Sequence, residues 1–154
     1  MTIPIIKNKL PKKETPKKIR PGAKALIVHD GKILVITEKT SSGEIIHDFP
    51  GGGIEFGETA QEALIREVKE EVGLTVVPGK PVGTWSFILD QWKTHILCIG
   101  FQCKVVGSLE LDFSHNPAEE NIFEVNWYTK EELLTHPEIL RAPFVIEAVK
   151  LVEI

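Results

Sequence analysis

Apolar residues gather along this chain in segments that Gly, Pro, Asp and Asn interrupt. β-Branched and aromatic residues dominate most of these segments, which is typical of β-strands. Two such runs between 22 and 39 surround Asp30 and Gly31, a dipeptide that favours the tight turn of a hairpin. We therefore predict a strand pair in this region. Further strands are predicted at 45–49, 74–77, 81–89, 94–105 and 122–129.

A helical period replaces the strand pattern at 59–72. The apolar arc that faces the core of the protein is predicted to contain Leu64, Ile65, Val68 and Val72. Thr59 and Glu62 fit a capping box at the start of this helix. Gly73 suits the left-handed residue that ends a helix. Both ends of the predicted helix are therefore marked in the sequence.

Two shorter helices are predicted nearer the C-terminus, at 130–136 and 143–154. A chain of 154 residues with 42% hydrophobic content suits one domain with a single core. The order of the elements predicts an α+β fold in which a mixed β-sheet is sandwiched between α-helices.

Charge divides the sequence into a basic N-terminal arm, residues 1–20, and a domain, residues 21–154. Seven of the 18 basic residues but only Glu14 of the 22 acidic residues lie in the arm, so the domain is acidic. Binding of a polyanion needs clustered Lys and Arg, and a nucleic-acid partner is therefore disfavoured for the domain. We interpret the arm as a solvated lead-in strand or a partly disordered tail rather than a nucleic-acid-binding segment.

The two cysteines, Cys98 and Cys103, lie five residues apart in one predicted strand and should point to opposite faces. They lack the spacing of a zinc site, and we interpret them as buried hydrophobic residues in a reducing compartment. We find neither a signal peptide nor a run of transmembrane length. The sequence therefore predicts a cytoplasmic location and no membrane partner.

Three carboxylates, those of Glu67, Glu70 and Glu71, share one face of the predicted helix. Like charges at these spacings cost a helix about 0.2–0.5 kcal/mol per pair. They also lie near its C-terminal end, where the helix dipole disfavours further negative charge. A bound Mg²⁺ or Mn²⁺ would turn the repulsion into coordination. The alternative is an ordinary solvated face with Lys69 as counter-charge.

A glycine cluster, Gly51–Gly53, follows Phe49 and Pro50 and is predicted to form a loop before this helix. Glycine lets a backbone turn tightly and approach a ligand closely. The Gly-Lys-Ser/Thr ending of a phosphate-binding P-loop is missing, which disfavours an ATPase or GTPase of that class.

Together the glycines and carboxylates have the spacing of a known motif. The sequence resembles the Nudix hydrolase family, of the MutT type, at every fixed position of the Nudix box: Gly52, Glu58, Arg66, Glu67, Val68, Glu70, Glu71, Gly73 and Leu74. This resemblance implies a Nudix fold. It also implies cleavage of the pyrophosphate bond of a nucleoside diphosphate linked to another moiety, with Mg²⁺ or Mn²⁺ assisting attack of water on phosphorus.

The resemblance also implies roles for individual residues. Metal ligands are expected to be the Gly51 carbonyl and the carboxylates of Glu67, Glu70, Glu71 and Glu120. Among these ligands Glu71 is the strongest candidate, and it belongs to the catalytic set together with Glu67. Glu67 is a candidate general base, although a glutamate of a later loop is an alternative. Arg66 belongs to that set as an anchor, pairing with Glu58 or a neighbouring carboxylate rather than with substrate.

The substrate is less strongly indicated by the sequence. Leu89 and Asp90 stand where ADP-ribose hydrolases of the family often carry proline, and the compact layout is similar to the MutT branch. By that resemblance Lys39, Phe87 and Trp92 are candidates to bind a small nucleotide. The segment LRAPFVIE has no asparagine where that branch reads an oxidised purine, so oxidised guanine is disfavoured.

Our leading hypothesis is therefore a Mg²⁺-dependent pyrophosphohydrolase of a (deoxy)nucleoside triphosphate. An ADP-ribose or nucleotide-sugar pyrophosphatase is one alternative, and a non-catalytic nucleotide-sensing module is another. The family often forms dimers, and the sequence leaves a homodimer open.

Overall fold

The computed structural model describes residues 5–6, 17–89, 93–116 and 121–154. Its strands are β1 (Ile5–Ile6), β2 (Lys18–His29), β3 (Lys32–Lys39), β4 (Ile45–Asp48), β5 (Gly51–Gly53), β6 (Val76–Leu89), β7 (Thr94–Val105) and β8 (Asn121–Thr129). The helices are α1 (Ala60–Val72), α2 (Lys130–Thr135) and α3 (Ile146–Leu151), with 3₁₀ turns at Pro137–Ile139 and Pro143–Val145.

These strands form one mixed sheet in the order β1-β6-β7-β2-β3-β4, with β5 paired to β2 and β8 paired to β3. β2 runs parallel to β7, and β1 runs parallel to β6. The predicted hairpin joins β2 to β3. Its turn residues have φ angles of 47° at Asp30 and 71° at Gly31, which a two-residue hairpin turn requires.

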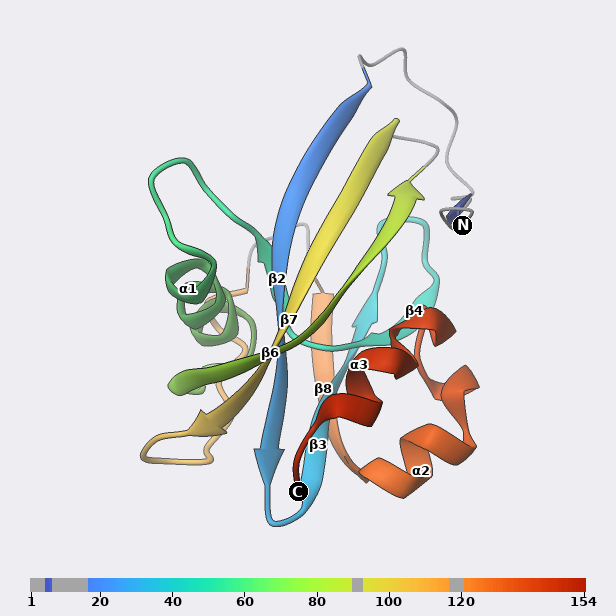
Figure 1. Ribbon diagram of the computed structural model, residues 1–154. Helices are drawn as coiled ribbons and strands as arrows, with labels where there is room; N and C mark the ends of the chain where they lie inside the picture. Colours follow the sequence, from blue (N-terminus) through green and yellow to red (C-terminus); the bar gives the residue numbers. More distant parts are fainter. Residues whose placement is uncertain (1–4, 7–16, 90–92, 117–120) are drawn as a thin grey trace.

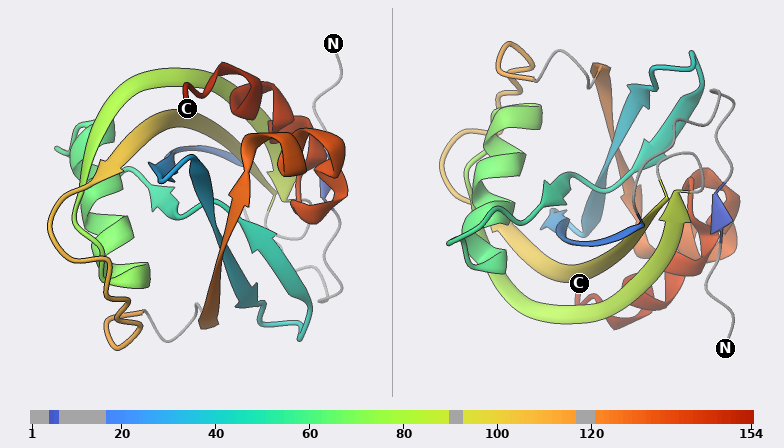
Figure 2. Two further views of the ribbon diagram at one scale, coloured as in Figure 1. Left: turned by 90° about the horizontal axis from the view of Figure 1, so that it is seen from below. Right: turned by 90° about the horizontal axis from the view of Figure 1, so that it is seen from above.

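Helices cover the sheet from two sides (Figures 1 and 2). α1 packs against one buried cluster, which includes Ala25, Leu64 and Phe101. α2 and α3 lie on the other side over a second cluster, which includes Leu26 and Val149. Alternate residues of β2 thus serve opposite cores, as the pleat of a strand requires. The predicted α+β sandwich is confirmed.

Two predicted elements differ from the observed ones. Residues 74–77 and 81–89 were expected as separate strands, but β6 is continuous, with irregular pairing to β7 around Pro78 and Pro81. Proline cannot donate a ladder hydrogen bond, and the irregularity accommodates it. The last helix is shorter than predicted, because α3 ends at Leu151 and the following backbone at Glu153 exchanges hydrogen bonds with the Gln102 side chain.

The long strand β2 begins inside the segment that was predicted to be the N-terminal arm. β2 begins at Lys18, and Lys18–Arg20 pair with Thr94–Ile96 of β7, so the last three residues of the predicted arm belong to the sheet. Residues Ile5 and Ile6 pair with Ile88 and Leu89 of β6. The remainder of residues 1–16 lies outside the described part.

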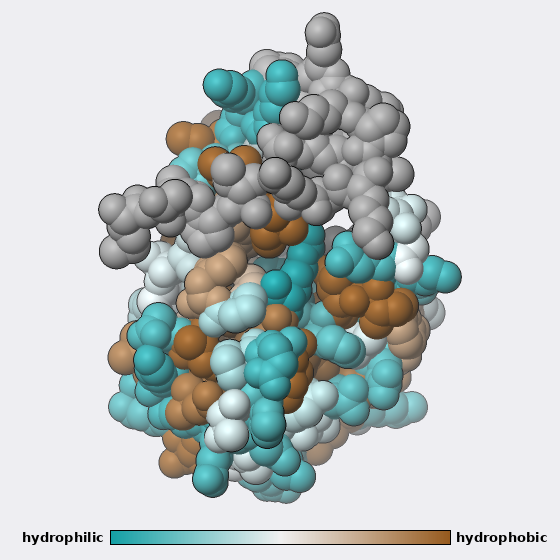
Figure 3. Space-filling model, turned by 90° about the vertical axis from the view of Figure 1, so that its right-hand side faces the viewer, coloured by the Kyte–Doolittle hydropathy of each residue, from teal (hydrophilic) through white to brown (hydrophobic). Residues whose placement is uncertain are grey.

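The outer face that carries α2 and α3 is mixed in character, with hydrophobic residues in groups among hydrophilic ones (Figure 3). Cys98 and Cys103 are both buried, as predicted, and each is free. In the described ranges, no helix has the length and apolar character needed to cross a bilayer.

Candidate active site

β5 brings the glycine cluster against α1. Gly51–Gly53 pair antiparallel with Gly22–Lys24 of β2, so the cluster is a short strand where a loop was expected. Gly51 has φ +139°, and a Cβ there would overlap the Ala23 carbonyl oxygen. A Cβ on Gly52 would lie 2.6 Å from Cδ of Glu67. The absence of side chains on this strand therefore lets the carboxylates of α1 approach its backbone.

The ends of α1 are fixed by the signals seen in the sequence. The Thr59 hydroxyl accepts a hydrogen bond of 3.1 Å from the Glu62 N–H. At the other end, Gly73 adopts φ 79° and donates its N–H to the Lys69 carbonyl at 3.1 Å. Leu64, Val68 and Val72 are fully buried. This anchoring sets the rotation of α1, and with it the direction of the glutamate face.

Arg66 lies among the carboxylates of the box. Its guanidinium donates to Glu58 at 2.6 Å and to Glu67 at 2.9 Å, and reaches Glu70 at 3.4 Å and Glu55 at 3.9 Å. It also donates to the Gly53 carbonyl at 3.2 Å. The hydrogen bond from Arg66 lowers the pKa of Glu58 to about 2, and the same bond raises the pKa of Arg66. Arg66 is thus an internal counter-ion.

The three candidate ligand glutamates differ in exposure. Glu71 is 2% exposed, and its Oε1 accepts the Gly51 N–H at 3.1 Å. Glu67 is nearly as well buried, whereas 37% of the Glu70 side chain is exposed. Within the described ranges, no three His, Cys, Asp or Glu side chains are gathered closely enough to hold one metal ion. The guanidinium of Arg66 contacts both Glu67 and Glu70.

The donor set nevertheless fits a hard divalent cation. Glu67 and Glu71 supply carboxylate oxygens beside the backbone of β5: Gly52 leaves room for the Glu67 carboxylate, and Gly51 donates its N–H to Glu71. Glu70 reaches the same arginine from the next turn of α1. Glu120, the remaining candidate ligand, lies outside the described residues.

A pocket of ≈ 230 Å³ adjoins the glycine strand on the α3 side of the sheet. It is lined by Arg20, Pro21, Gly22, Lys24, Glu38, Asp48, Gly52, Gly53, Phe87, Leu89, Ile96, Cys98 and Arg141. Phe87, a predicted substrate contact, is among them, and its ring centroid lies 6.2 Å from that of Phe144. Lys39 is exposed and does not line this pocket; its strand neighbour Glu38 does. Trp92 lies outside the described residues.

Lys24 is a largely buried cation that lines this pocket. Its Nζ donates to the Asp48 carboxylate at 3.2 Å and to the Phe49 carbonyl at 3.1 Å. Burial disfavours the ammonium, but Asp48 and Glu71 outweigh that effect and raise the pKa of Lys24. For the carboxyl of Glu38 the effect of burial has the opposite sign: burial raises its pKa, and the charge of Lys24 partly offsets this increase.

The sequence analysis did not identify the three cations that line this pocket, Arg20, Lys24 and Arg141. Arg20 and Lys24 share a face of β2, and their even spacing with Gly22 was a usable signal once the strand start was known. Arg141 follows the 3₁₀ turn after α2, and no local pattern in the sequence places it there.

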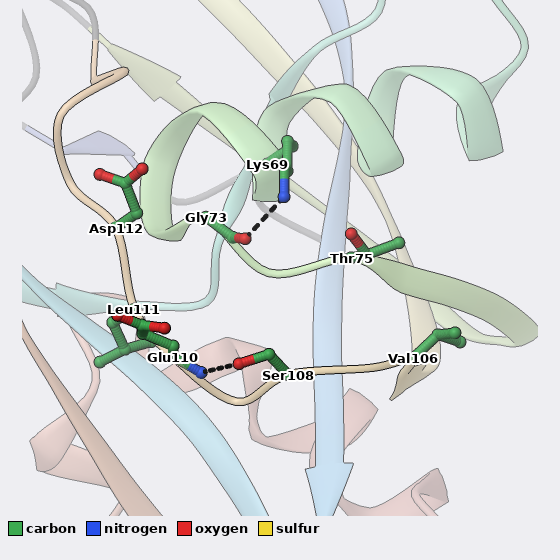
Figure 4. Close-up of a pocket in the computed structure, with 8 residues that line it drawn as sticks. All are labelled: Lys69, Gly73, Thr75, Val106, Ser108, Glu110, Leu111 and Asp112. Carbon is green, nitrogen blue, oxygen red and sulfur yellow. Dashed lines mark hydrogen bonds between the residues drawn. The ribbon is translucent and has the colours of Figure 1, made fainter.

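A second pocket, of ≈ 480 Å³, lies at the C-terminal end of α1 (Figure 4). It is lined by Lys69, Gly73, Thr75, Val106, Ser108, Glu110, Leu111 and Asp112. In Figure 4 the Lys69 ammonium points to the Gly73 carbonyl, at 3.0 Å. None of the box glutamates lines either of these two pockets, but the smaller one includes Gly52 and Gly53, the glycines beside Glu67 and Arg66.

Comparison with known proteins agrees with this geometry. The sequence profile of the NUDIX domain matches residues 18–149. The chain is 35% identical over 101 residues to the ADP-ribose pyrophosphatase of Methanocaldococcus jannaschii, which covers 66% of this chain and 59% of that enzyme. This chain therefore aligns with less than two thirds of that relative's length.

Two further similarities extend over more of both chains. Phosphatase NudJ of Escherichia coli strain K12 is 32% identical over 127 residues, covering 82% of this chain and 78% of NudJ. The crystal structure of a MutT protein from Methanosarcina mazei Go1 superimposes with a TM-score of 0.71 at 27% identity, covering 90% of this chain and 96% of that one.

Proposed function

Because this chain belongs to the Nudix hydrolase family, we propose that it is a Mg²⁺-dependent pyrophosphohydrolase whose substrate is a (deoxy)nucleoside triphosphate. The observation that carries the proposal is the packing of the α1 glutamates against the glycine strand, with Glu71 buried and bonded to the Gly51 N–H. Burial of a carboxylate is costly unless a specific partner or ligand compensates it. A structural role alone does not require three carboxylates on one helix end, two of them buried.

Glu67, Glu70, Glu71 and the Gly51 carbonyl would hold the Mg²⁺, with Glu120 as a further proposed ligand. Mn²⁺, which also accepts hard oxygen donors, is an alternative ion. When bound, the ion would neutralise charge on the phosphate oxygens and favour ionisation of water.

The remaining steps belong to the side chains of this protein. Glu67 would accept the proton of the attacking water, and its carboxylate is held by the Arg66 guanidinium at 2.9 Å. Arg66 would orient the Glu67 carboxylate. Its guanidinium also donates hydrogen bonds to Glu58 and to the Gly53 carbonyl, which hold these groups against α1. Phe87 offers an aromatic wall in the adjoining pocket, on which a nucleobase can stack.

ADP-ribose is the second candidate substrate. It is supported by the 35% identity to an enzyme named ADP-ribose pyrophosphatase. A nucleotide-sensing module without activity is disfavoured, because every fixed position of the box is present.

A hydrolysis panel with Mg²⁺ tests the proposal. It contains the common and oxidised deoxynucleoside triphosphates, ADP-ribose, nucleotide sugars and dinucleoside polyphosphates. We expect Glu71→Gln to lower kcat/KM on the preferred substrate by about 100-fold or more, because a proposed metal-binding charge is lost. The matched control is Glu62→Gln, an exposed first-turn residue of α1, which should behave like the wild type. Unchanged activity of Glu71→Gln, or no metal-dependent turnover on any substrate, contradicts the proposal.

A further inference from the structure

The pocket beside the box has more positive than negative side chains. Arg20, Lys24 and Arg141 face Glu38 and Asp48. Lys24 is already engaged by Asp48 and the Phe49 carbonyl. In the part of the chain that the structure describes, neither arginine side chain has a hydrogen-bond or ion-pair partner, although Arg141 acts on Glu38 electrostatically. Among the described residues, nothing therefore competes with a ligand for these two guanidinium groups by a hydrogen bond or ion pair.

Arg20 lies at the junction of the pocket and the box. It packs over Gly53, where a Cβ would come within 2.6 Å of both Nε and Nη2 of its guanidinium. The carbonyl of the same glycine accepts a hydrogen bond from Arg66. One residue of β5 thus contacts the arginine of the box and the arginine of the pocket.

The cation of the box itself is fully committed, because Arg66 contacts four carboxylates. A substrate with several phosphates needs positive charge beyond what a metal at the glutamates provides. Arg20 and Arg141 are the pocket cations without an acidic partner within 4 Å among the described residues. Guanidinium groups bind phosphate through two parallel hydrogen bonds, which suits them to this task.

We propose that Arg20 and Arg141 together bind a phosphate of the substrate that is not the one attacked, and so select nucleotides with three or more phosphates over those ending in an uncharged sugar. This inference rests on the proposed function. The pocket volume of ≈ 230 Å³ is below the usual size of a complete ligand site, so it accommodates one part of a substrate.

The test compares ATP with ADP-ribose, which share the adenosine diphosphate portion. Arg20→Ala and Arg141→Ala should each lower kcat/KM for ATP about 10-fold or more, mainly through KM, because charge-assisted hydrogen bonds are lost. The loss for ADP-ribose should be clearly smaller. Lys104→Ala removes an exposed charge from β7, outside this pocket, and serves as control for both activity and thermal stability.

Gly53→Ala provides a second, independent variant. Its methyl group meets the mobile end of the Arg20 side chain, so the guanidinium should be displaced while the chain still folds. We expect the same preference change as for Arg20→Ala, with no charge removed. Arg20→Lys should recover only part of the loss, since an ammonium lacks the planar fork.

Binding of inorganic tripolyphosphate, measured by calorimetry in a chelating buffer, separates this inference from the proposed function. If no substrate is hydrolysed but tripolyphosphate binds the wild type and not the arginine variants, the enzyme assignment fails and the arginine site stands. Equal losses for ATP and ADP-ribose overturn the inference. So does tripolyphosphate binding that neither arginine substitution weakens.

Discussion

Gly73 meets two separate demands at the end of α1. Its φ of 79° is left-handed, and a Cβ would lie 2.6 Å from Cβ and 2.8 Å from N of Asp112. The Asp112 N–H donates to the Val72 carbonyl at 2.9 Å, which holds the β7–β8 connection against the helix end. Only a residue without a side chain satisfies both conditions at low cost.

Gly73→Ala should therefore destabilise the protein more than an ordinary left-handed glycine would. Gly107 is the matched control, since its φ of 81° is nearly the same and nothing lies within 4 Å of its Cβ position. We expect Gly107→Ala to cost about 1 kcal/mol from backbone strain. Gly73→Ala should cost about 1–3 kcal/mol more, from overlap with Asp112. Urea unfolding measures both, and equal losses would show that the overlap is relieved without cost.

β5 is the element that joins the two halves of the candidate site. Glycine is unfavourable in strands, so the sequence predicted a loop for residues 51–53. Pairing with β2 overrides that preference, because the neighbouring strand supplies hydrogen-bond partners that a loop would lack. Each glycine then has its own neighbour: backbone of β2 at Gly51, Glu67 at Gly52 and Arg20 at Gly53.

Alanine substitutions along β5 should separate folding from activity. Gly51→Ala meets main-chain atoms of Ala23 and Lys24 and should cost at least about 3 kcal/mol of unfolding free energy. The three atoms nearest to a Cβ at Gly52 all belong to the carboxylate end of Glu67, which can move. We expect Gly52→Ala to keep a near-native thermal midpoint while kcat falls about 100-fold, since Glu67 leaves its position. Full activity in Gly52→Ala would argue against a catalytic role for Glu67.

At the scale of the whole molecule, local signals in the sequence predicted the sheet with its covering helices and the Nudix box. They did not predict the pocket that contains Arg20 and Arg141. The Asp30–Gly31 turn, the α1 caps and the glutamate spacing are all short-range features, which a single sequence displays. The pocket instead combines Arg20 with Arg141, which lie more than a hundred residues apart in the chain. Their meeting depends on strand register and on the path after α2, and no local period encodes either. Because residues 1–20 are rich in lysine, Arg20 was predicted to belong to the basic arm.

Truncation tests the predicted boundary between the basic arm and the domain, since β2 begins at Lys18. The described contacts of residues 1–16 are confined to the two-residue strand β1, so a chain beginning at Lys17 should keep most of its stability. A chain beginning at Pro21 loses three residues of β2 that pair with β7, at a cost of about 1–4 kcal/mol. It should also lose the preference for ATP over ADP-ribose. Thermal unfolding of both truncated proteins measures this difference. Equal losses of stability from the two deletions would contradict a boundary at Lys18.

Arg66 also bears on the order in which this protein is assembled. The guanidinium of Arg66 neutralises part of the negative charge of Glu58, Glu67 and Glu70. Helix α1 can therefore pack against β5 before a metal ion binds. On the proposed function, a metal that comes later has to take Glu67 and Glu70 from the arginine. Folding and loading are then successive events, and the strength of the arginine contacts decides how much free Mg²⁺ a newly made molecule needs before it can work.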